Sequence, residues 1–114
     1  MVMSDERLKT FEEFWPFYLN EHRDPVNRRL HFFGTGGVLI LIIYALFVQN
    51  LSVLFLCPLL GYGSAWIGHF LIEKNRPATF RYPLWSLLGD FRMFFLAVTG
   101  RLNGELDTHL RDVA

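Results

Sequence analysis

Residues 30–72, LHFFGTGGVLILIIYALFVQNLSVLFLCPLLGYGSAWIGHFLI, decide the fold, because this stretch of 43 residues contains no Lys, Arg, Asp or Glu. One membrane-spanning helix needs about 20 apolar residues, so the stretch is long enough for two. Its polar interruption, Gln49-Asn50-Leu51-Ser52, suits a tight turn. We therefore predict a hairpin of two apolar helices, at about 32–48 and about 53–72.

The composition of the whole chain agrees with a membrane protein. Of its 114 residues, 52% are hydrophobic and 19% are charged, which is more apolar surface than so short a chain can bury. The alternative is a buried helical pair in a soluble bundle, but such helices normally carry a polar stripe, and the hairpin shows none. We predict an all-α fold, an integral membrane helical bundle built on a transmembrane hairpin with flanking interfacial or packed helices, as one domain over residues 1–114.

Charge and cysteine content narrow the class of protein further. The net charge of zero gives no electrostatic reason to expect nucleic acid as a partner. The single cysteine, Cys57, cannot form an intramolecular disulfide. The first nine residues mix charges with no apolar stretch behind them, so they do not resemble a cleaved signal peptide.

The basic residues around the hairpin predict its orientation. They lie on both outer sides, whereas the connecting turn is uncharged, so we expect both termini in the cytoplasm, at a bacterial inner membrane or at the endoplasmic reticulum of a eukaryote. The flanking basic residues are Arg23, Arg28, Arg29, Lys74, Arg76 and Arg81.

Further helices are predicted outside the hairpin. One covers about 11–22, where Thr10 and Glu13 form a capping box, although Pro16 leaves its start open because proline interrupts a helix interior. The pair Asp24-Pro25 is typical of a helix start, with an N-cap residue followed by proline at the first helical position.

The last apolar segment covers about 83–99 and begins at Pro83. It contains Asp90 and Arg92, and two ionisable residues so close together disfavour a lipid-facing span. We expect a helix that packs on the hairpin or lies in the membrane interface, with a third span as the alternative. Residues 100–114 are expected to form a polar tail.

Three histidines are predicted to meet at one end of the bundle. His22 ends the first helix, His31 lies in the second turn of the next, and His69 lies near the end of the return helix. If the hairpin closes antiparallel, His31 and His69 reach the same depth, and a corner at Asp24 folds His22 back toward them. Three imidazoles that converge in this way can hold a divalent transition metal. The alternative is that each histidine forms a hydrogen bond to a neighbouring helix or a lipid headgroup. His109 lies in the predicted tail and is expected to be a solvated surface residue.

Several polar residues near these histidines are candidates for the same site. Glu73 lies four residues after His69, so it can be a fourth ligand, can orient an imidazole, or can mark the membrane edge. Asn27, Arg28 and Arg76 can bind the carboxylate of a fatty acid, because arginine recognises carboxylates through two parallel hydrogen bonds. Their positions at a cytoplasmic boundary are also explained by topology alone.

A series of sequence blocks resembles a known family. Together they resemble the 2-hydroxy fatty acid dioxygenase family of small membrane proteins, over roughly Phe14 to Asp90. The blocks are Phe14-Trp15-Pro16-Phe17-Tyr18-Leu19, Glu21-His22, Asn27-Arg28-Arg29-Leu30-His31-Phe32, Gly61-Tyr62-Gly63, Trp66, Gly68-His69-Phe70, Glu73, Asn75-Arg76-Pro77-Ala78-Thr79 and Pro83-Leu84.

The resemblance implies an iron(II)-dependent α-oxidation. A 2-hydroxy fatty acid and O₂ become the acid one carbon shorter, CO₂ and water, a reaction that balances without an external reductant. His22, His31 and His69 match the family's histidine positions and are the implied iron ligands and catalytic residues. The implied partners are a 2-hydroxy fatty acid, O₂ and membrane lipid, without nucleic acid, and the protein can form oligomers.

Other functions fit parts of the same pattern. A di-iron hydroxylase needs many more histidines than four. A haem protein with His31 and His69 as axial ligands is a better alternative. A lipid-binding membrane protein without catalytic activity is the alternative from a different class.

Overall fold

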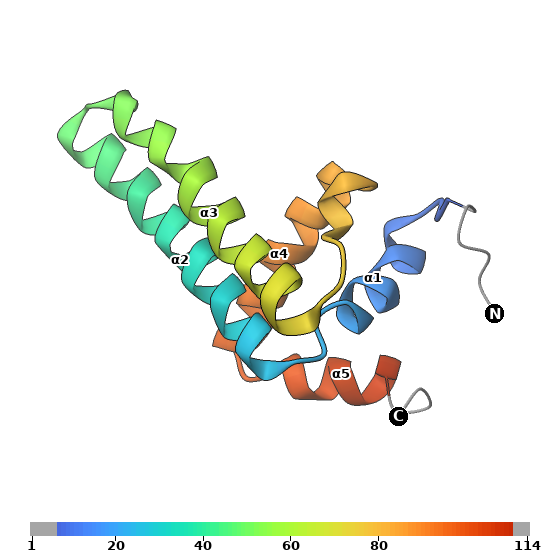
Figure 1. Ribbon diagram of the computed structural model, residues 1–114. Coiled ribbons are helices and arrows are strands. Elements are labelled where there is room, and N and C mark those ends of the chain that lie inside the picture. The colour runs from blue at the N-terminus through green and yellow to red at the C-terminus, as the bar shows by residue number, and fades with distance from the viewer. Residues whose placement is uncertain (1–6, 111–114) are drawn as a thin grey trace.

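The computed structural model describes residues 7–110, which are almost entirely helical (Figure 1). No strand occurs within that range, which confirms the all-α prediction. The α-helices are α1 (Phe11–Asn20), α2 (Pro25–Val48), α3 (Leu56–Ile67), α4 (Pro83–Val98) and α5 (Leu102–Leu110). Three short helical segments join them, the 3₁₀ turns η1 (Leu51–Phe55) and η3 (Ala78–Phe80) and the π-helical η2 (Gly68–Glu73).

The hairpin consists of α2 and α3 packed side by side (Figure 1). The chain reverses at Gln49, which adopts a left-handed conformation with φ of 56°, and the side chain of Asn50 then accepts a hydrogen bond from the Ser52 N–H. Glycine allows the two helices to approach closely. A Cβ atom placed on Gly34 would lie only 3.2 Å from the Cβ atom of Ser64, so a larger residue there would push the helices apart.

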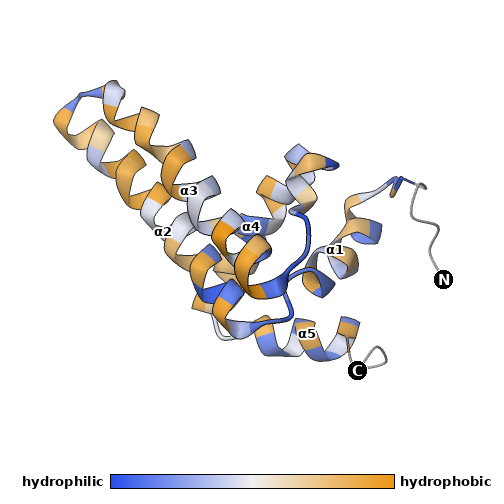
Figure 2. Ribbon diagram, viewed as in Figure 1, coloured by the Kyte–Doolittle hydropathy of each residue, from blue (hydrophilic) through white to orange (hydrophobic). Residues whose placement is uncertain are grey.

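Both helical segments of the hairpin are long and apolar enough to cross a membrane. The two segments are Pro25–Val48 and Leu51–Glu73, and only 22% and 11% of their most apolar windows are buried within the protein. A core helix of a soluble protein would be mostly buried. Figure 2 shows that the apolar colouring runs along both helices of the hairpin and that polar residues gather at the turn and at the opposite end.

The other helices pack around the end of the hairpin that is far from the turn (Figure 1). Their core is rich in aromatic side chains. Phe14, Trp15 and Tyr18 of α1 are at most 2% exposed, and Phe14 contacts the rings of Tyr82 and Trp85. We call this end the base of the hairpin, and we call the remainder, residues 36–60 with the turn, its arm.

The predicted helix starts are confirmed. Thr10 accepts a hydrogen bond from the Glu13 N–H at the start of α1, and Asp24 accepts one from the Val26 N–H at the start of α2. Pro16 lies inside α1 without ending it. The corner between α1 and α2 therefore falls at residues 21–24, and it places His22 against the base of the hairpin.

Helix α4 packs on α1 and α2. The Tyr18 hydroxyl donates a hydrogen bond to the half-buried carboxyl group of Asp90. The guanidinium of Arg92 lies 4.5 Å from the centre of the Trp15 ring and 3.7 Å from a carboxylate oxygen of Glu105. Both ionisable groups on α4 thus have protein partners, as expected for a packed helix.

The structure corrects the interpretation of residues 100–114 as a polar tail. Residues 102–110 form α5, whose Leu102 and Leu110 are buried and whose Leu106 packs on the same core. The indole N–H of Trp15 donates a 2.7 Å hydrogen bond to Glu105. Leucines at every fourth position make one apolar side of a helix, which is enough to attach an otherwise polar segment to α1. Residues 111–114 lie outside the described range.

Candidate metal centre

Three imidazole rings meet at the base of the hairpin, each from a different segment. His22 follows α1, His31 belongs to α2 and His69 to η2, and none of the three is more than 4% exposed. The Nε2 atom of His22 lies 3.1 Å from the Nε2 atom of His31 and 3.1 Å from that of His69. The rings are nearly perpendicular, with interplanar angles of 79–87°. Their nitrogens therefore point at one place from three directions.

The opposite nitrogen of each ring faces an oxygen acceptor. His22 Nδ1 lies 2.6 Å from the Tyr18 carbonyl oxygen, and His31 Nδ1 lies 2.9 Å from that of Asn27. His69 Nδ1 lies 2.7 Å from Oδ1 of Asn75. The Asn75 amide can only point this way, because its Nδ2 donates to a backbone carbonyl at Glu21. Since these oxygens can only accept, each Nδ1 carries the hydrogen.

This pattern leaves three unprotonated Nε2 atoms facing one another. A neutral imidazole with its hydrogen on Nδ1 has a lone pair on Nε2. The Nε2 atom of His22 lies 3.1 Å from each of the other two, so these lone pairs repel one another in the absence of a cation. Nitrogens this far apart can both lie about 2.1 Å from one shared metal ion. Among residues 7–110, His22, His31 and His69 form the one group of side chains close enough together to hold a metal ion.

The electrostatic environment keeps the first of these ligands neutral. Burial lowers the pKa of His22 well below its ordinary value, and the neighbouring His31 and His69 lower it further. The ring of Tyr18 stacks on His22 with 4.0 Å between centroids. A neutral imidazole is the form that binds metal, so no proton has to leave His22 near pH 7 before binding.

The π-helical segment η2 places His69 in the cluster. A π-helical turn is wider than an α-helical one and is found frequently at functional sites. Its first residue, Gly68, lies against Asn27, and a Cβ atom on Gly68 would be 1.8 Å from Oδ1 of Asn27. Only glycine leaves room for that amide, which is fully buried beside His31 on α2.

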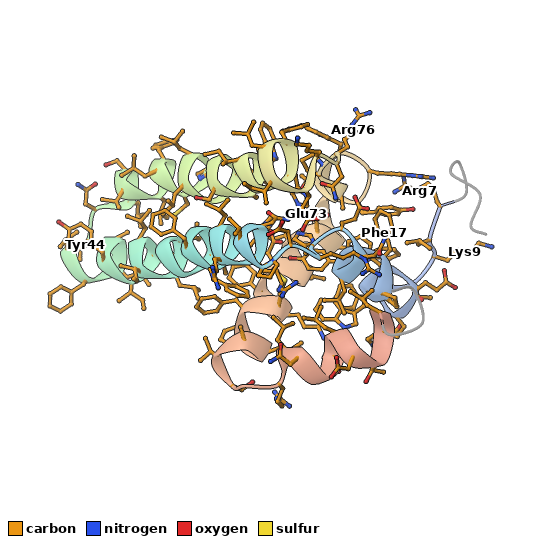
Figure 3. The ribbon with its side chains drawn as sticks, turned by 60° about the horizontal axis from the view of Figure 1, so that its bottom comes forward. Arg7, Lys9, Phe17, Tyr44, Glu73 and Arg76 are labelled. Atoms are coloured by element: carbon orange, nitrogen blue, oxygen red, sulfur yellow. The ribbon has the colours of Figure 1, made fainter. Side chains whose placement is uncertain are left out.

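Glu73 forms hydrogen bonds at the corner between α1 and α2. One carboxylate oxygen accepts hydrogen bonds from the backbone N–H of Asp24 and, over 3.3 Å, from Nδ2 of Asn27. Figure 3 shows Glu73 where the hairpin base meets the remaining helices. Asn27 also supplies the carbonyl oxygen that orients His31, so Glu73 is linked to the cluster through Asn27, and which of its three predicted roles applies stays a prediction.

The structure gives Arg28 and Arg76 partners other than the cluster. Arg28 donates to the backbone carbonyls of His22 and Arg23, at 2.9 and 2.7 Å. The guanidinium of Arg76 lies 5.1 Å from the centre of the Phe80 ring and points away from the protein in Figure 3. Their predicted contact with a substrate carboxylate stays a prediction. His109 lies apart on α5, 3.6 Å from Glu105.

Two adjoining cavities reach the cluster. The larger, of about 200 Å³, lies between α2, α3 and α4, and the smaller, of about 10 Å³, is lined by all three histidines. Both are lined by His31, Tyr62, Ala65 and Asp90. The remaining lining of the larger cavity is Thr35, Val38, Cys57, Pro58, Gly61, Leu87 and Phe91. A mostly apolar space therefore ends at the histidines.

Comparison with known proteins decides the family. A family model described as "2-hydroxy-palmitic acid dioxygenase Mpo1-like" matches residues 8–102, which include all three clustered histidines. The chain belongs to this Mpo1-like family. The resemblance drawn from the sequence blocks is confirmed. No curated protein and no solved structure matches the chain significantly.

The Mpo1-like family name implies a dioxygenase that acts on a 2-hydroxy fatty acid. The geometry argues against the haem alternative, because the ring centroids of His31 and His69 are 4.9 Å apart and leave no room for a macrocycle between them. Sequence reasoning did not place Ser86 and Asp90 of α4 near the histidines. The sequence did carry a signal for them: Asp90 is an ionisable residue within an apolar helix, four residues after Ser86, and such residues often mark a functional site.

Proposed function

We propose that this Mpo1-like protein is a membrane-embedded, iron(II)-dependent dioxygenase that converts a 2-hydroxy fatty acid into the fatty acid one carbon shorter. The observation that carries the proposal is the convergence of three Nε2 lone pairs at the end of an apolar cavity. Family membership supports the substrate class, because the family is described by its action on 2-hydroxy-palmitic acid.

His22, His31 and His69 would hold the iron. Bound iron(II) would supply a centre at which O₂ and the 2-hydroxy acid can react, as in other non-haem iron oxygenases. The protein's own contribution is to fix the three rings through the oxygens of Tyr18, Asn27 and Asn75, and to keep bulk water away through burial. Three neutral ligands leave the charge of the cation uncompensated, which favours binding of a carboxylate.

The larger cavity would receive the acyl chain. His31 lines it at the base, and Val38 lies seven residues further along α2, which is about 10 Å at the helical rise. Cys57 and Pro58 of α3 line it as well, so the cavity extends from the histidines into the arm. A fatty acid in this position would hold its head at the cluster and its tail among the apolar helices.

The hairpin would cross the membrane with its base at the cytoplasmic surface. Apolar side chains cover the outer surface of the arm, where Ile43 is 66% and Phe47 87% exposed. Residues 30–72 carry no charged side chain, so the charged residues lie outside the arm and the turn. Cysteine labelling in a Cys57→Ser background tests this: Asn50→Cys should react only from outside the cell and Asp107→Cys only from inside. Labelling of both from the same side would contradict the topology.

Product analysis tests the proposed reaction. Protein purified without oxygen is loaded with iron(II), mixed with 2-hydroxyhexadecanoic acid and exposed to O₂, and the products are identified by mass spectrometry. We expect pentadecanoic acid and CO₂, with hexadecanoic acid left unchanged in a parallel reaction. An unaltered 2-hydroxy acid in the presence of bound iron would refute the substrate while leaving the metal centre intact.

A further inference from the structure

Helix α4 turns two polar side chains toward the histidine cluster. Ser86 and Asp90 are four residues apart on one side of the helix, and both line the small cavity that the three histidines line. The proposed function assigns neither of them a role. Ser86 is only 3% exposed, and Asp90 is half-buried, with its carboxyl group against the Tyr18 hydroxyl.

Ser86 has an unsatisfied hydroxyl. Its Oγ atom is fully buried and has no hydrogen-bond partner among the described residues. Leaving a buried hydroxyl without a partner is costly, so native proteins do it rarely and usually for a reason. Since Ser86 lines the same cavity as the three histidines, a ligand in that cavity would be a partner for its hydroxyl group.

Asp90 is only half satisfied. The Tyr18 hydroxyl donates a hydrogen bond to one carboxyl oxygen of Asp90. Within residues 7–110, Tyr18 is the single hydrogen-bond partner of this side chain. Asp90 lines both cavities, so its other oxygen has the cavities as its neighbourhood. Tyr18 also stacks on His22 and orients it through its carbonyl oxygen, so Asp90 is held at a fixed position relative to the cluster.

The charges at the site favour an ionised Asp90 once a cation is bound. Among the residues that line either cavity, Asp90 is the one with a carboxyl group, and desolvation raises its pKa to about 7 in the absence of a cation. Three neutral histidines and a divalent cation carry two positive charges, while Asp90 and a substrate carboxylate carry one negative charge each. Together they are neutral, and a neutral set of charges is the least costly to bury.

We propose that Asp90 and Ser86 form the head-group pocket for the 2-hydroxy acid, an inference that rests on the proposed function. Asp90 accepts a hydrogen bond from the substrate's 2-hydroxyl group, and Ser86 donates one to its carboxylate. Asp90 therefore selects for the hydroxylated acid, and Ser86 binds the part that hydroxylated and plain fatty acids share.

This division of roles has a physical basis. A site that contains a buried hydrogen-bonding group discriminates strongly against an analogue that cannot satisfy it. Hexadecanoic acid lacks the 2-hydroxyl and would leave one oxygen of Asp90 without a partner. Both acids present the same carboxylate to Ser86, so the Ser86 hydroxyl adds affinity without selectivity.

Equilibrium binding without turnover tests the pocket. Iron(II)-loaded protein in lipid nanodiscs is titrated under nitrogen with 2-hydroxyhexadecanoic acid and with hexadecanoic acid, and Kd is measured by calorimetry. The variants are Asp90→Asn, which keeps an acceptor for Tyr18 but turns an N–H₂ group toward the cavity, and Ser86→Ala. The matched controls are Asp107→Asn on the surface of α5 and Ser64→Ala, a buried serine of α3 that lines neither cavity.

We expect wild-type protein and both controls to prefer the hydroxylated acid by about tenfold or more, the effect of one hydrogen bond to a charged group. Asp90→Asn should reduce that preference to about twofold or less, and Ser86→Ala should weaken both acids by a similar factor of about three to ten. Iron content is measured for every protein, and loss of iron from Asp90→Asn would overturn the role given to Asp90, because a residue that contacts only the substrate leaves the metal in place.

Two further outcomes would overturn the inference. Asp90→Asn with wild-type selectivity, or with equal weakening of both acids, would show that Asp90 only supports the fold. Ser86→Ala with wild-type affinity for both acids would remove Ser86 from the pocket. The proposed function is judged separately, because it fails if the wild-type protein itself does not bind the hydroxylated acid or does not convert it.

Discussion

The arm and the base of the hairpin belong to the same two helices but are built in opposite ways. In the arm, large apolar side chains such as Ile43 and Phe47 face outward. In the base, which carries the charged residues, the buried side chains include the polar groups of His22, Asn27 and His69. The arm therefore depends on an apolar surrounding for its stability, whereas the base depends on specific internal contacts. The candidate metal centre lies in the base, where hydrogen bonds orient the three histidines.

The largest expected effect of any single substitution falls on the base. His22→Ala, His31→Ala and His69→Ala should each abolish stoichiometric iron binding, because each removes one of three converging Nε2 atoms. His109→Ala, which changes a histidine on α5, should bind iron like the wild type. Metal analysis of protein purified without oxygen gives the result, and full iron content in any of the first three variants would exclude that residue as a ligand.

Substituting one phenylalanine in each region compares their contributions to the free energy of unfolding. Phe14 in the base is fully buried, whereas Phe47 in the arm is 87% exposed. In one detergent, Phe14→Ala should lower the free energy of unfolding by about 3–5 kcal/mol, the usual cost of removing a buried ring. Phe47→Ala should change it by no more than about 0.5 kcal/mol. Chemical unfolding followed by circular dichroism measures both, and equal losses would mean that the arm packs against protein instead of lipid.

A smaller effect is expected from a residue that orients a ligand without binding metal. Asn75 holds His69 Nδ1 and the carbonyl of Glu21. Asn75→Leu should weaken metal affinity by about 10–100-fold, the typical cost of losing such a partner. Asn103→Leu on the surface of α5 is the control. Competition with a chelator measures the affinity, and unchanged binding in Asn75→Leu would show that the π-helical backbone orients His69 unaided.

The sequence predicted the parts of this structure that depend on local pattern. The uncharged stretch 30–72 predicted the hairpin, and Asp24-Pro25 predicted the start of α2. Antiparallel closure of that hairpin predicted a common depth for two of the histidines, the corner before α2 predicted the approach of the third, and the structure places the three together. Each of these inferences needed only helix geometry and neighbouring residues.

The remaining features depend on contacts between distant segments. Helix α5 attaches through three leucines and the bond from Trp15 to Glu105, which no local pattern reveals. The positions of Ser86 and Asp90 opposite the histidines depend on how α4 packs on α1. Arg28, predicted from the sequence to bind a substrate carboxylate, donates in the structure to the backbone carbonyls of His22 and Arg23, and its contact with substrate stays a prediction.

X-ray absorption spectroscopy of the iron(II)-loaded protein tests the central claim most directly, namely that the base holds one iron through three imidazoles. The account predicts one iron per chain, a fine-structure signal from three histidine rings at about 2.1 Å, and no sulfur or porphyrin contribution. Fewer than three imidazoles, a sulfur ligand, or iron well below one per chain would contradict it.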